Sequence, residues 1–423
     1  MDEVHVETIL YLAGSRYRTE YDCHRYELLR RKWNMYEKYA DAFHWLESQK
    51  ENMITTLKNF VQTPSCGREP EDVISFSEMF LEFLEKEGFS CRYIPVGNEN
   101  GGTISAIYGE EREGKPILFS GHYDTALYRQ ITDKENPWKR EKGKLYGSGV
   151  LDMKGGIVIA IYCARALKQI GWDKRPLKMI WSGDEEVNHK GSNGGEIFHR
   201  EALGCECAFH METGFPEKEL CIGRKGGVRC KIQVEGIDAH AGKDFEKGRN
   251  AIVEMAYKIL EIKNLTNMDR GTTLNVGTIQ GGTIFNSVPA HCEIIVDMRF
   301  TSNQELADTK EKLEAILKKT YVEGTTTHWE YIDSMPVFET TPEGLKLFRF
   351  LQKTAENAGL PVPESIYSGG SSDAAATAMA GVPTVCACGT IGEWNHTTKE
   401  YIWEDSLVER AKFFTAAILD IFQ

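Results

Sequence analysis

The chain has 423 residues, of which 41% are hydrophobic and 27% are charged, and its formal net charge is −13. This length exceeds that of one ordinary core and indicates about two domains, and the composition is that of a soluble globular protein. The acidic balance argues against a nucleic-acid-binding surface and gives no support for a role at a membrane surface. No apolar run reaches the roughly 20 residues that span a bilayer, and the acidic start MDEVHVETIL differs from the basic start of a signal peptide. We therefore expect a cytoplasmic protein.

Residues 1–36 are polar and carry a basic cluster at 30–32, which predicts a helical extension ahead of the main domain. An amphipathic helix is then expected over 38–62 and another over 75–88, where the apolar residues recur at helical spacing. Strand-like runs follow at 90–96, 103–108 and 116–120. A strongly apolar helix over 153–170 opens with two glycines, which allow close packing beneath a site, and buried strands are expected at 177–182 and 208–211.

This alternation of strands and helices predicts an α/β fold with a largely parallel sheet and helices on both faces. After residue 224 the order changes to β-α-β-β-α-β, which indicates a compact unit inserted into the first domain. The expected division is a helical extension at 1–36, a first part of the catalytic domain at 37–224, an inserted domain at 225–338 and a second part of the catalytic domain at 339–423. A helix over 343–358, a strand at the run PTVCACG and a closing helix over 404–422 complete the chain.

The eleven cysteines are scattered along the chain. Cys205 and Cys207, and likewise Cys386 and Cys388, are Cys-x-Cys pairs in or beside strand-like runs, where alternation puts both thiols of a pair on one face. Such pairs can bind a metal, but buried reduced thiols are the favoured interpretation.

Five acidic or histidine-bearing segments lie near the ends of apolar strand-like runs, which is where open α/β sheets collect their ligands. They are PILFSGHYDT with His122 and Asp124, GSGVLDMKGG with Asp152, IWSGDEEVN with Glu185 and Glu186, AFHMETG with Glu212, and GEWNHTTKEYI with His396. Each segment alone has an ordinary explanation, namely a solvated turn, a helix cap or an acidic loop. Their combination favours one metal centre.

The chemistry of these residues fits a site for two metal ions. His122 is expected to be a ligand, and Asp124, two residues on, to support it by orienting either its ring or the backbone. Asp152 offers two oxygens and can bridge two ions. Three crowded carboxylates at 184–186 would repel one another without a cation nearby, and one of them can bind metal while its neighbour takes a proton from water.

Charge balance supports the same interpretation. Two divalent ions bring four positive charges, whereas Asp152, Glu186 and Glu212 with a bridging hydroxide bring four negative charges, so that a half-buried site is close to neutral. Mixed imidazole and carboxylate ligands suit zinc, with cobalt or manganese as substitutes.

Together, the motifs GHYDT, GSGVLDMKGG, GDEE, METG and NHTTKEYI resemble those of the co-catalytic zinc aminoacylase/carboxypeptidase family. This family includes glutamate carboxypeptidase, acetylornithine deacetylase and succinyl-diaminopimelate desuccinylase, and the resemblance covers residues 38–423. It implies that His122 and Glu212 bind one zinc, that Glu186 and His396 bind the other and that Asp152 bridges them. Glu185 would then be the general base.

The resemblance further implies that the inserted domain is a lid and a surface for homodimerisation. The segment GIDAHAGKDFEKGRNAI carries His240, which in the family reaches an active site, usually that of the partner, and stabilises the oxyanion. Asn286 and Arg299 are implied to meet the substrate, as is the turn that contains Gly369 and Ser372. The sequence leaves other roles open for three of these residues: a surface histidine for His240, a turn cap for Asn286, and for Arg299 an ion pair with Asp297.

We therefore expect a zinc-dependent metallopeptidase or amidohydrolase. Its substrate would be a small peptide or an N-acyl amino acid, cleaved at an amide bond next to an amino acid carboxylate. An aminopeptidase or dipeptidase on the same scaffold is the alternative. A non-catalytic, metal-containing binding protein and a protein with a single structural metal are rival interpretations from other classes.

Overall fold

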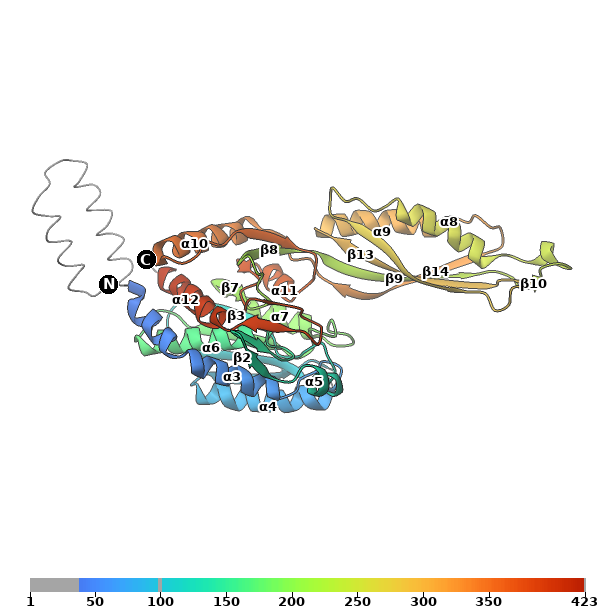
Figure 1. Ribbon diagram of the computed structural model, residues 1–423. Coiled ribbons are helices and arrows are strands. Elements are labelled where there is room, and N and C mark those ends of the chain that lie inside the picture. Colours follow the sequence, from blue (N-terminus) through green and yellow to red (C-terminus); the bar gives the residue numbers. More distant parts are fainter. Residues whose placement is uncertain (1–37, 98–100, 422–423) are drawn as a thin grey trace, which may run out of the picture.

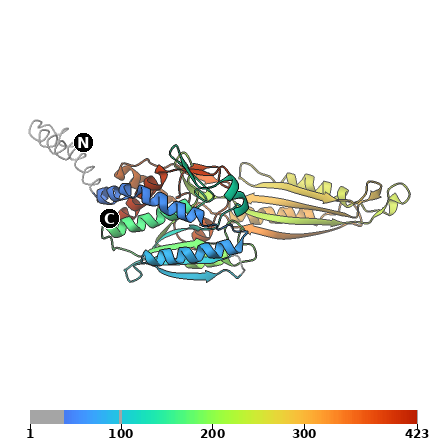
Figure 2. The ribbon, with the colours of Figure 1, turned by 60° about the horizontal axis from the view of Figure 1, so that its bottom comes forward.

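The computed structural model describes residues 38–97 and 101–421, and the helical extension predicted at 1–36 lies outside these ranges. Figure 1 shows a large unit, built from both ends of the described chain, and a narrower unit that projects from it. Figure 2 shows the same long, two-part shape from another side. The projecting unit, from β9 to β14, is called the inserted unit below.

The large unit is built on a six-stranded sheet with the order β1-β2-β6-β3-β7-β16. Strands β6, β3, β7 and β16 are parallel, whereas β2 runs antiparallel to β6 and β1 antiparallel to β2. The bounds are β1 (Ser90–Pro95), β2 (Gly102–Tyr108), β3 (Ile117–His122), β6 (Leu177–Ser182), β7 (Cys207–His210) and β16 (Thr384–Val385). The predicted, largely parallel sheet is confirmed.

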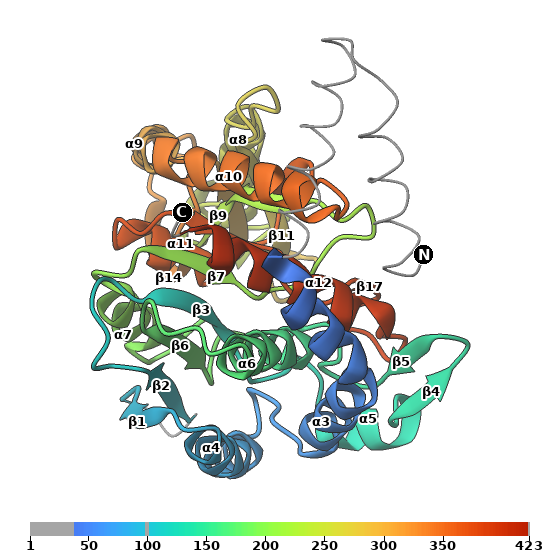
Figure 3. The ribbon, with the colours of Figure 1, turned by 90° about the vertical axis from the view of Figure 1, so that its left-hand side faces the viewer.

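Helices cover both faces of this sheet, as predicted (Figure 3). Ile117 and Phe119 of β3 join the main core with α3, α4, α6 and α12, whereas the intervening Leu118 packs with α7 and α11 on the opposite face. The bounds are α3 (Lys50–Gln62), α4 (Pro70–Lys86), α6 (Lys154–Gln169), α7 (Gly194–Ala202), α10 (Pro342–Ala358), α11 (Ala374–Met379) and α12 (Asp405–Asp420). The helix predicted over 38–62 is interrupted at Gln49, which precedes α3.

The inserted unit has the predicted strand and helix order. Its four-stranded antiparallel sheet has the order β11-β13-β9-β14, and α8 and α9 pack on it to form a separate core. Asn250 caps the start of α8 and Ser302 caps that of α9, each by accepting a backbone N–H. The bounds are β9 (Gly226–Glu235), α8 (Ala251–Lys263), β11 (Thr273–Gly281), β13 (His291–Phe300), α9 (Asn303–Leu317) and β14 (Thr326–Met335), with the short pair β10 (Ala239–His240) and β12 (Ser287–Val288).

Smaller elements frame the large unit, and the sequence did not predict most of them. A second antiparallel sheet joins β17, β18, β5 and β4, and β15 pairs in parallel with β8. Their bounds, with that of α5, are β4 (Lys139–Glu141), β5 (Lys144–Tyr146), β8 (Leu220–Arg224), β15 (Ser365–Ser368), β17 (Gly392–Glu393), β18 (Tyr401–Trp403) and α5 (Arg129–Glu135).

The chain enters and leaves the inserted unit at neighbouring points. Arg224 and Phe338 exchange two backbone hydrogen bonds, of 2.9 and 3.1 Å, just outside β9 and β14. All cysteines within the described ranges are free thiols, and most of them are buried. None of the described helices is long and apolar enough to cross a membrane.

Candidate metal centre and active site

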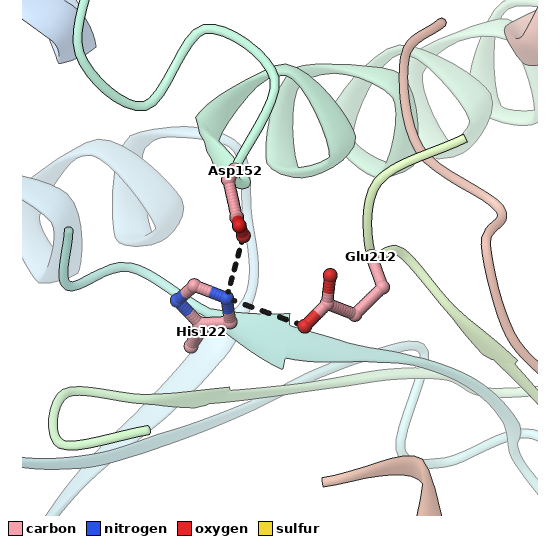
Figure 4. A group of neighbouring side chains, drawn as sticks. All are labelled: His122, Asp152 and Glu212. Atoms are coloured by element: carbon pink, nitrogen blue, oxygen red, sulfur yellow. Dashed lines mark ion pairs between the residues drawn. The ribbon is translucent and has the colours of Figure 1, made fainter. Parts of the chain in front are cut away.

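Four of the predicted site residues follow the carboxyl ends of parallel strands and therefore meet at one edge of the sheet. His122 ends β3, Glu185 and Glu186 follow β6, and Glu212 follows β7 by two residues. Asp152 lies two residues before α6, and its side chain points towards His122 at this edge (Figure 4).

Two groups of three side chains share Asp152. In the first group, His122 Nε2 lies 3.2 Å from Asp152 Oδ1 and 3.5 Å from Glu212 Oε1. In the second group, His396 Nε2 lies 3.1 Å from Asp152 Oδ2 and 3.2 Å from Glu186 Oε2. The two oxygens of one carboxylate thus face two different imidazoles, which is the arrangement that a bridging ligand needs.

The chemistry of these donors fits divalent cations. His122 Nε2, Asp152 Oδ1 and Glu186 Oε1 are buried and have no hydrogen-bond partner among the described residues, which is unusual for buried polar atoms. Burial first, and then the charge of Asp152, raises the pKa of Glu186 to about 7. Carboxylates crowded in this way are stabilised by cations. Two imidazoles and three carboxylates are a donor set that zinc accepts.

Asp124 contacts His122 from the side opposite to this cluster. His122 Nδ1 lies 3.1 Å from the backbone oxygen of Asp124 and 3.3 Å from its Oδ1. A proton on Nδ1 would leave the Nε2 lone pair facing Asp152 and Glu212, so we assign this tautomer. Asp124 Oδ2 also accepts the backbone N–H of Glu186 at 2.9 Å, so one carboxylate orients parts of both groups.

Asp152 is itself held from behind by Glu400, a residue that the sequence analysis missed. The buried Glu400 carboxylate accepts the backbone N–H groups of Leu151 at 2.8 Å, Asp152 at 3.0 Å and Gly149 at 3.0 Å. Asn395 adds a bond of 3.1 Å from Nδ2 to Asp152 Oδ2. The only signal for Glu400 in the sequence was its place four residues after His396 in the same motif.

The two glycines that open α6 bring the helix against the site, as their small size suggested. A Cβ at Gly156 would lie 2.1 Å from the backbone oxygen of Met211, directly before Glu212. A Cβ at Gly155 would lie 2.4 Å from the backbone oxygen of Val150. Larger residues at these positions would displace the segments that carry Glu212 and Asp152.

Glu185 is the carboxylate beside the cluster that belongs to neither group of three. Its side chain is buried, with 9% of its surface exposed. Burial is the largest cause that raises its pKa well above the ordinary value for glutamate, and nearby Glu212 and Asp373 raise it further. A carboxylate whose charged form is destabilised by burial is a stronger proton acceptor than an ordinary glutamate, which suits a general base.

The structure does not bring His240 and Asn286 to this cluster within one chain. His240 lies on β10, at the far tip of the inserted unit, whereas β3 and β7 lie in the large unit (Figure 1). The ring of His240 is exposed, and its Nδ1 accepts the backbone N–H groups of Gly242 and Lys243, both at 3.1 Å, so Nε2 carries the proton. Asn286 is exposed on the same tip, where its backbone oxygen bonds to Ala241.

Arg299 lies at the base of the inserted unit and forms a bidentate ion pair with Asp297, at 2.7 and 3.1 Å. It also lines a small cavity together with Asn188, which follows the Glu185–Glu186 pair. In the predicted substrate turn, Gly369 is exposed. Ser372 is buried, and its hydroxyl accepts the N–H of Ala374 at 3.1 Å.

A cleft of about 460 Å³ opens beside Glu186, between the large unit and the inserted unit. Two arginines that the sequence analysis did not select, Arg68 and Arg229, line it. Arg229 is paired with Asp333, and Arg68 donates to the backbone oxygen of Ala126. Neither arginine lies in a recognisable motif, so their convergence appears only in the folded chain.

Comparison with known proteins shows which proteins this chain is similar to. The family model of the M20 peptidase dimerisation domain matches residues 222–325. Carboxypeptidase G2 of a Pseudomonas species is 24% identical over 374 residues, which covers 87% of this chain and 88% of that protein. Succinyl-diaminopimelate desuccinylase of Xylella fastidiosa is 26% identical and covers 79% and 89%. Acetylornithine deacetylase of Myxococcus xanthus is also 26% identical and covers 77% and 86%.

Solved structures share the fold at lower identity. The aminopeptidase PepT of Bacillus cereus superposes with a TM-score of 0.74 at 22% identity, and covers 88% of this chain and 99% of that chain. An M20 family metallo-carboxypeptidase of Sulfolobus solfataricus gives a TM-score of 0.66 at 19% identity, with coverage of 87% and 98%. Both units of the molecule therefore occur together in known structures.

Proposed function

We propose that the protein is a metallopeptidase or amidohydrolase of the M20 type, like the relatives that it resembles, and that it hydrolyses an amide bond next to an amino acid carboxylate at a pair of zinc ions. The substrate would be a small peptide or an N-acyl amino acid. The sharing of Asp152 between two groups of three ligands is the observation that carries the proposal. The names of the relatives, a carboxypeptidase and two deacylases, support the same substrate class.

His122 and Glu212 would hold one ion, Glu186 and His396 the other, and Asp152 both. Zinc held by these residues would supply a water of lowered pKa and a Lewis acid for the carbonyl oxygen, and cobalt or manganese would be possible substitutes. Asp124 and Glu400 act through their neighbours, because one orients His122 and the other fixes the backbone of Asp152.

Glu185 would be the general base. Its carboxylate takes a proton from the attacking water and later returns it to the leaving nitrogen, a double role that its raised pKa supports. Arg299 would release Asp297 in part and bind the substrate carboxylate with its planar guanidinium. Gly369 and the backbone of its turn would line the substrate's path.

His240 would act across a homodimer. Its Nε2–H is an exposed donor that can stabilise an oxyanion, but it projects at the far tip of the inserted unit. The proposal therefore places it, with Asn286, over the metal centre of a second copy. Movement of the inserted unit towards the large unit would close the cleft and exclude water.

The proposal is tested with a panel of dipeptides, tripeptides and N-acyl amino acids, each assayed after loading with zinc or cobalt. A matched series in which the carboxylate is amidated and the amino group is free separates a carboxypeptidase or deacylase from an aminopeptidase. Faster turnover of the amidated series would contradict the assigned substrate class. Metal analysis should give two ions per chain, and one structural ion without hydrolysis would exclude the mechanism.

The role of Glu185 has its own test. Glu185→Gln keeps the size of the side chain but removes the base, so kcat should fall at least ~100-fold while the metal content stays unchanged. Unchanged turnover in this variant would remove Glu185 from the mechanism.

A further inference from the structure

His189 lies between two buried carboxylates, outside the proposed set of metal ligands. Its Nδ1 is 2.8 Å from Asp184 Oδ1, and its Nε2 is 2.7 Å from Asp373 Oδ1. Asp184 and Asp373 are almost fully buried. Both ring nitrogens of His189 therefore face acceptors, which is the environment of an imidazolium.

The backbone at His189 is held in an uncommon conformation. His189 has a φ of 51°, and Asn188 before it has a φ of 55°. Two consecutive non-glycine residues in the left-handed region persist only where surrounding contacts determine them. The contacts here are the two ring bonds and the backbone bond from His189 N to Asp184 O, at 3.0 Å.

The two carboxylates belong to different functional segments. Asp184 directly precedes Glu185, and its position is further fixed by Ser182, whose hydroxyl donates to Oδ1 at 2.9 Å, and by Ser192, whose hydroxyl donates to Oδ2 at 2.5 Å. Asp373 ends the predicted substrate turn, residues 369–373. His189 thus joins the segment that carries Glu185 to this turn.

The substrate turn is also hydrogen-bonded to the connection that leads into the inserted unit. Lys225 N donates to the backbone oxygen of Ser368 at 3.0 Å, and the hydroxyl of Ser371 donates to the backbone oxygen of Lys225 at 3.0 Å. Arg224 adds a longer contact, of 3.4 Å, from Nη1 to the backbone oxygen of Gly370. A continuous set of contacts therefore runs from the segment of Glu185 through His189 to the base of the inserted unit.

We propose that His189 is a positioning residue that fixes Glu185 relative to the substrate turn and the connection to the inserted unit. It touches none of the predicted reacting groups. It acts through Asp184, the immediate neighbour of Glu185, and through Asp373. The consequence for catalysis rests on the proposed role of Glu185, whereas the mechanical link between the two segments does not.

His189→Gly is the most informative change. Glycine adopts a φ of 51° without strain, and removal of the ring leaves a space that exogenous imidazole can enter. We expect kcat to fall ~100-fold, the size of effect that a misplacement of about 1 Å produces, with a much smaller change in KM. Added imidazole should restore kcat. His189→Gln, which can donate to one of the two carboxylates, should be intermediate.

Lys142→Gly is the matched control, because Lys142 has the same φ of 51° in the turn between β4 and β5, outside the site. Its kcat should equal that of the unmodified protein, with and without imidazole. A fall in kcat for His189→Gly that imidazole does not reverse, or an equal fall for Lys142→Gly, would overturn the positioning role.

Hydrogen exchange tests the mechanical link without any substrate. In His189→Gly, backbone amides of residues 183–193 and 368–377 should exchange faster together, and imidazole should slow both sets together. Faster exchange confined to the segment around residue 189 would refute the link, whatever activity the protein has. If the link holds but no amide is hydrolysed, the proposed function fails and the connection between the two segments stands.

Discussion

At the scale of single residues, the site depends on carboxylates that have different tasks although they lie close together. Asp152 presents its two oxygens to two imidazoles, whereas Glu400 presents its oxygens to three backbone N–H groups behind it. Glu185 has neither set of partners, and its pKa is raised chiefly by burial. The environment of each carboxylate, more than its residue type, therefore determines its chemistry.

Glu400→Gln should weaken both the fold and the metal site. One side-chain oxygen becomes an NH₂ group that faces backbone donors, so the unfolding free energy should fall by about 1–3 kcal/mol in urea titrations. Because the backbone of Asp152 is then less well held, zinc affinity measured by chelator competition should fall about 10- to 100-fold. The control is Glu409→Gln on α12, whose carboxylate forms a half-exposed pair with Lys218. Equal losses in the two variants would contradict this account of Glu400.

His189 should make stability depend on pH. Burial alone would lower its pKa, but the charges of Asp373 and Asp184 outweigh burial and hold the pKa well above its usual value. Its stabilisation is therefore fully present below the unfolded pKa of about 6.5 and is lost as pH rises through the raised folded pKa. At low pH, the unfolding free energy of the unmodified protein should exceed that of His189→Gln by about 3 kcal/mol. This difference should become smaller as pH rises. A difference that grows with increasing pH would show the opposite sign of linkage.

At the scale of elements, the site is a product of parallel strands and one closely packed helix. Strands β3, β6 and β7 end at a common edge, and α6 approaches β7 where Gly156 leaves no side chain. The close approach sets the position of Glu212 relative to Asp152. Packing that supports function in this way is sensitive to a single methyl group.

Gly156→Ala should therefore be damaging. The added Cβ would lie 2.1 Å from the backbone oxygen of Met211, so α6 or the Glu212 segment must shift. We expect a loss of about 1–3 kcal/mol in unfolding free energy and a loss of bound zinc. Gly195→Ala in α7 is the control, since its Cβ would make only an ordinary contact at 3.6 Å. The better helix propensity of alanine should raise the unfolding free energy of this control variant by up to about 1 kcal/mol. A stabilising Gly156→Ala would refute the packing argument.

The elements that the sequence predicted share a common property, namely a long periodic or continuous apolar run. The buried strand Leu177–Ser182 followed by acidic residues, and the apolar helix α6 after two glycines, could be located to within a few residues. The sheet of β4, β5, β17 and β18 could not, because its strands have two or three residues each and its two hairpins are joined by the pairing of β18 with β5, in which Tyr401 lies opposite Tyr146. His189 was missed for the same reason, because its position is explained by a contact with Asp373, which is 184 residues away in the sequence.

At the scale of the whole molecule, the inserted unit carries apolar residues that no described part of the chain covers. Leu260 on α8 is 62% exposed and Ile279 on β11 is 57% exposed. β11 is also an edge strand, whose unpaired backbone groups are available to a second sheet. These features fit the proposed homodimer, in which His240 of one copy serves the other.

The double variant Leu260→Lys with Ile279→Lys should dissociate such a dimer. Light scattering should show the mass of a dimer for the unmodified protein and that of one chain, 47.8 kDa, for the variant. Because each metal centre would then lack the partner's donor, kcat should fall together with the dimer fraction. A monomeric variant with full activity would mean that His240 has no role across an interface. If the unmodified protein is itself monomeric, the proposed homodimer is wrong.

The neighbouring entry and exit of the inserted unit give it the character of an exchangeable module. Arg224 and Phe338 are bonded to each other, so the chain leaves the large unit and returns to it at a single point. A replacement module needs only two ends at that spacing, and the parallel sheet behind it keeps its order. Such an architecture keeps every predicted metal-binding residue in the large unit, so that exchange of one continuous stretch of the chain would replace His240, Asn286 and Arg299 together while the metal-binding residues remain untouched.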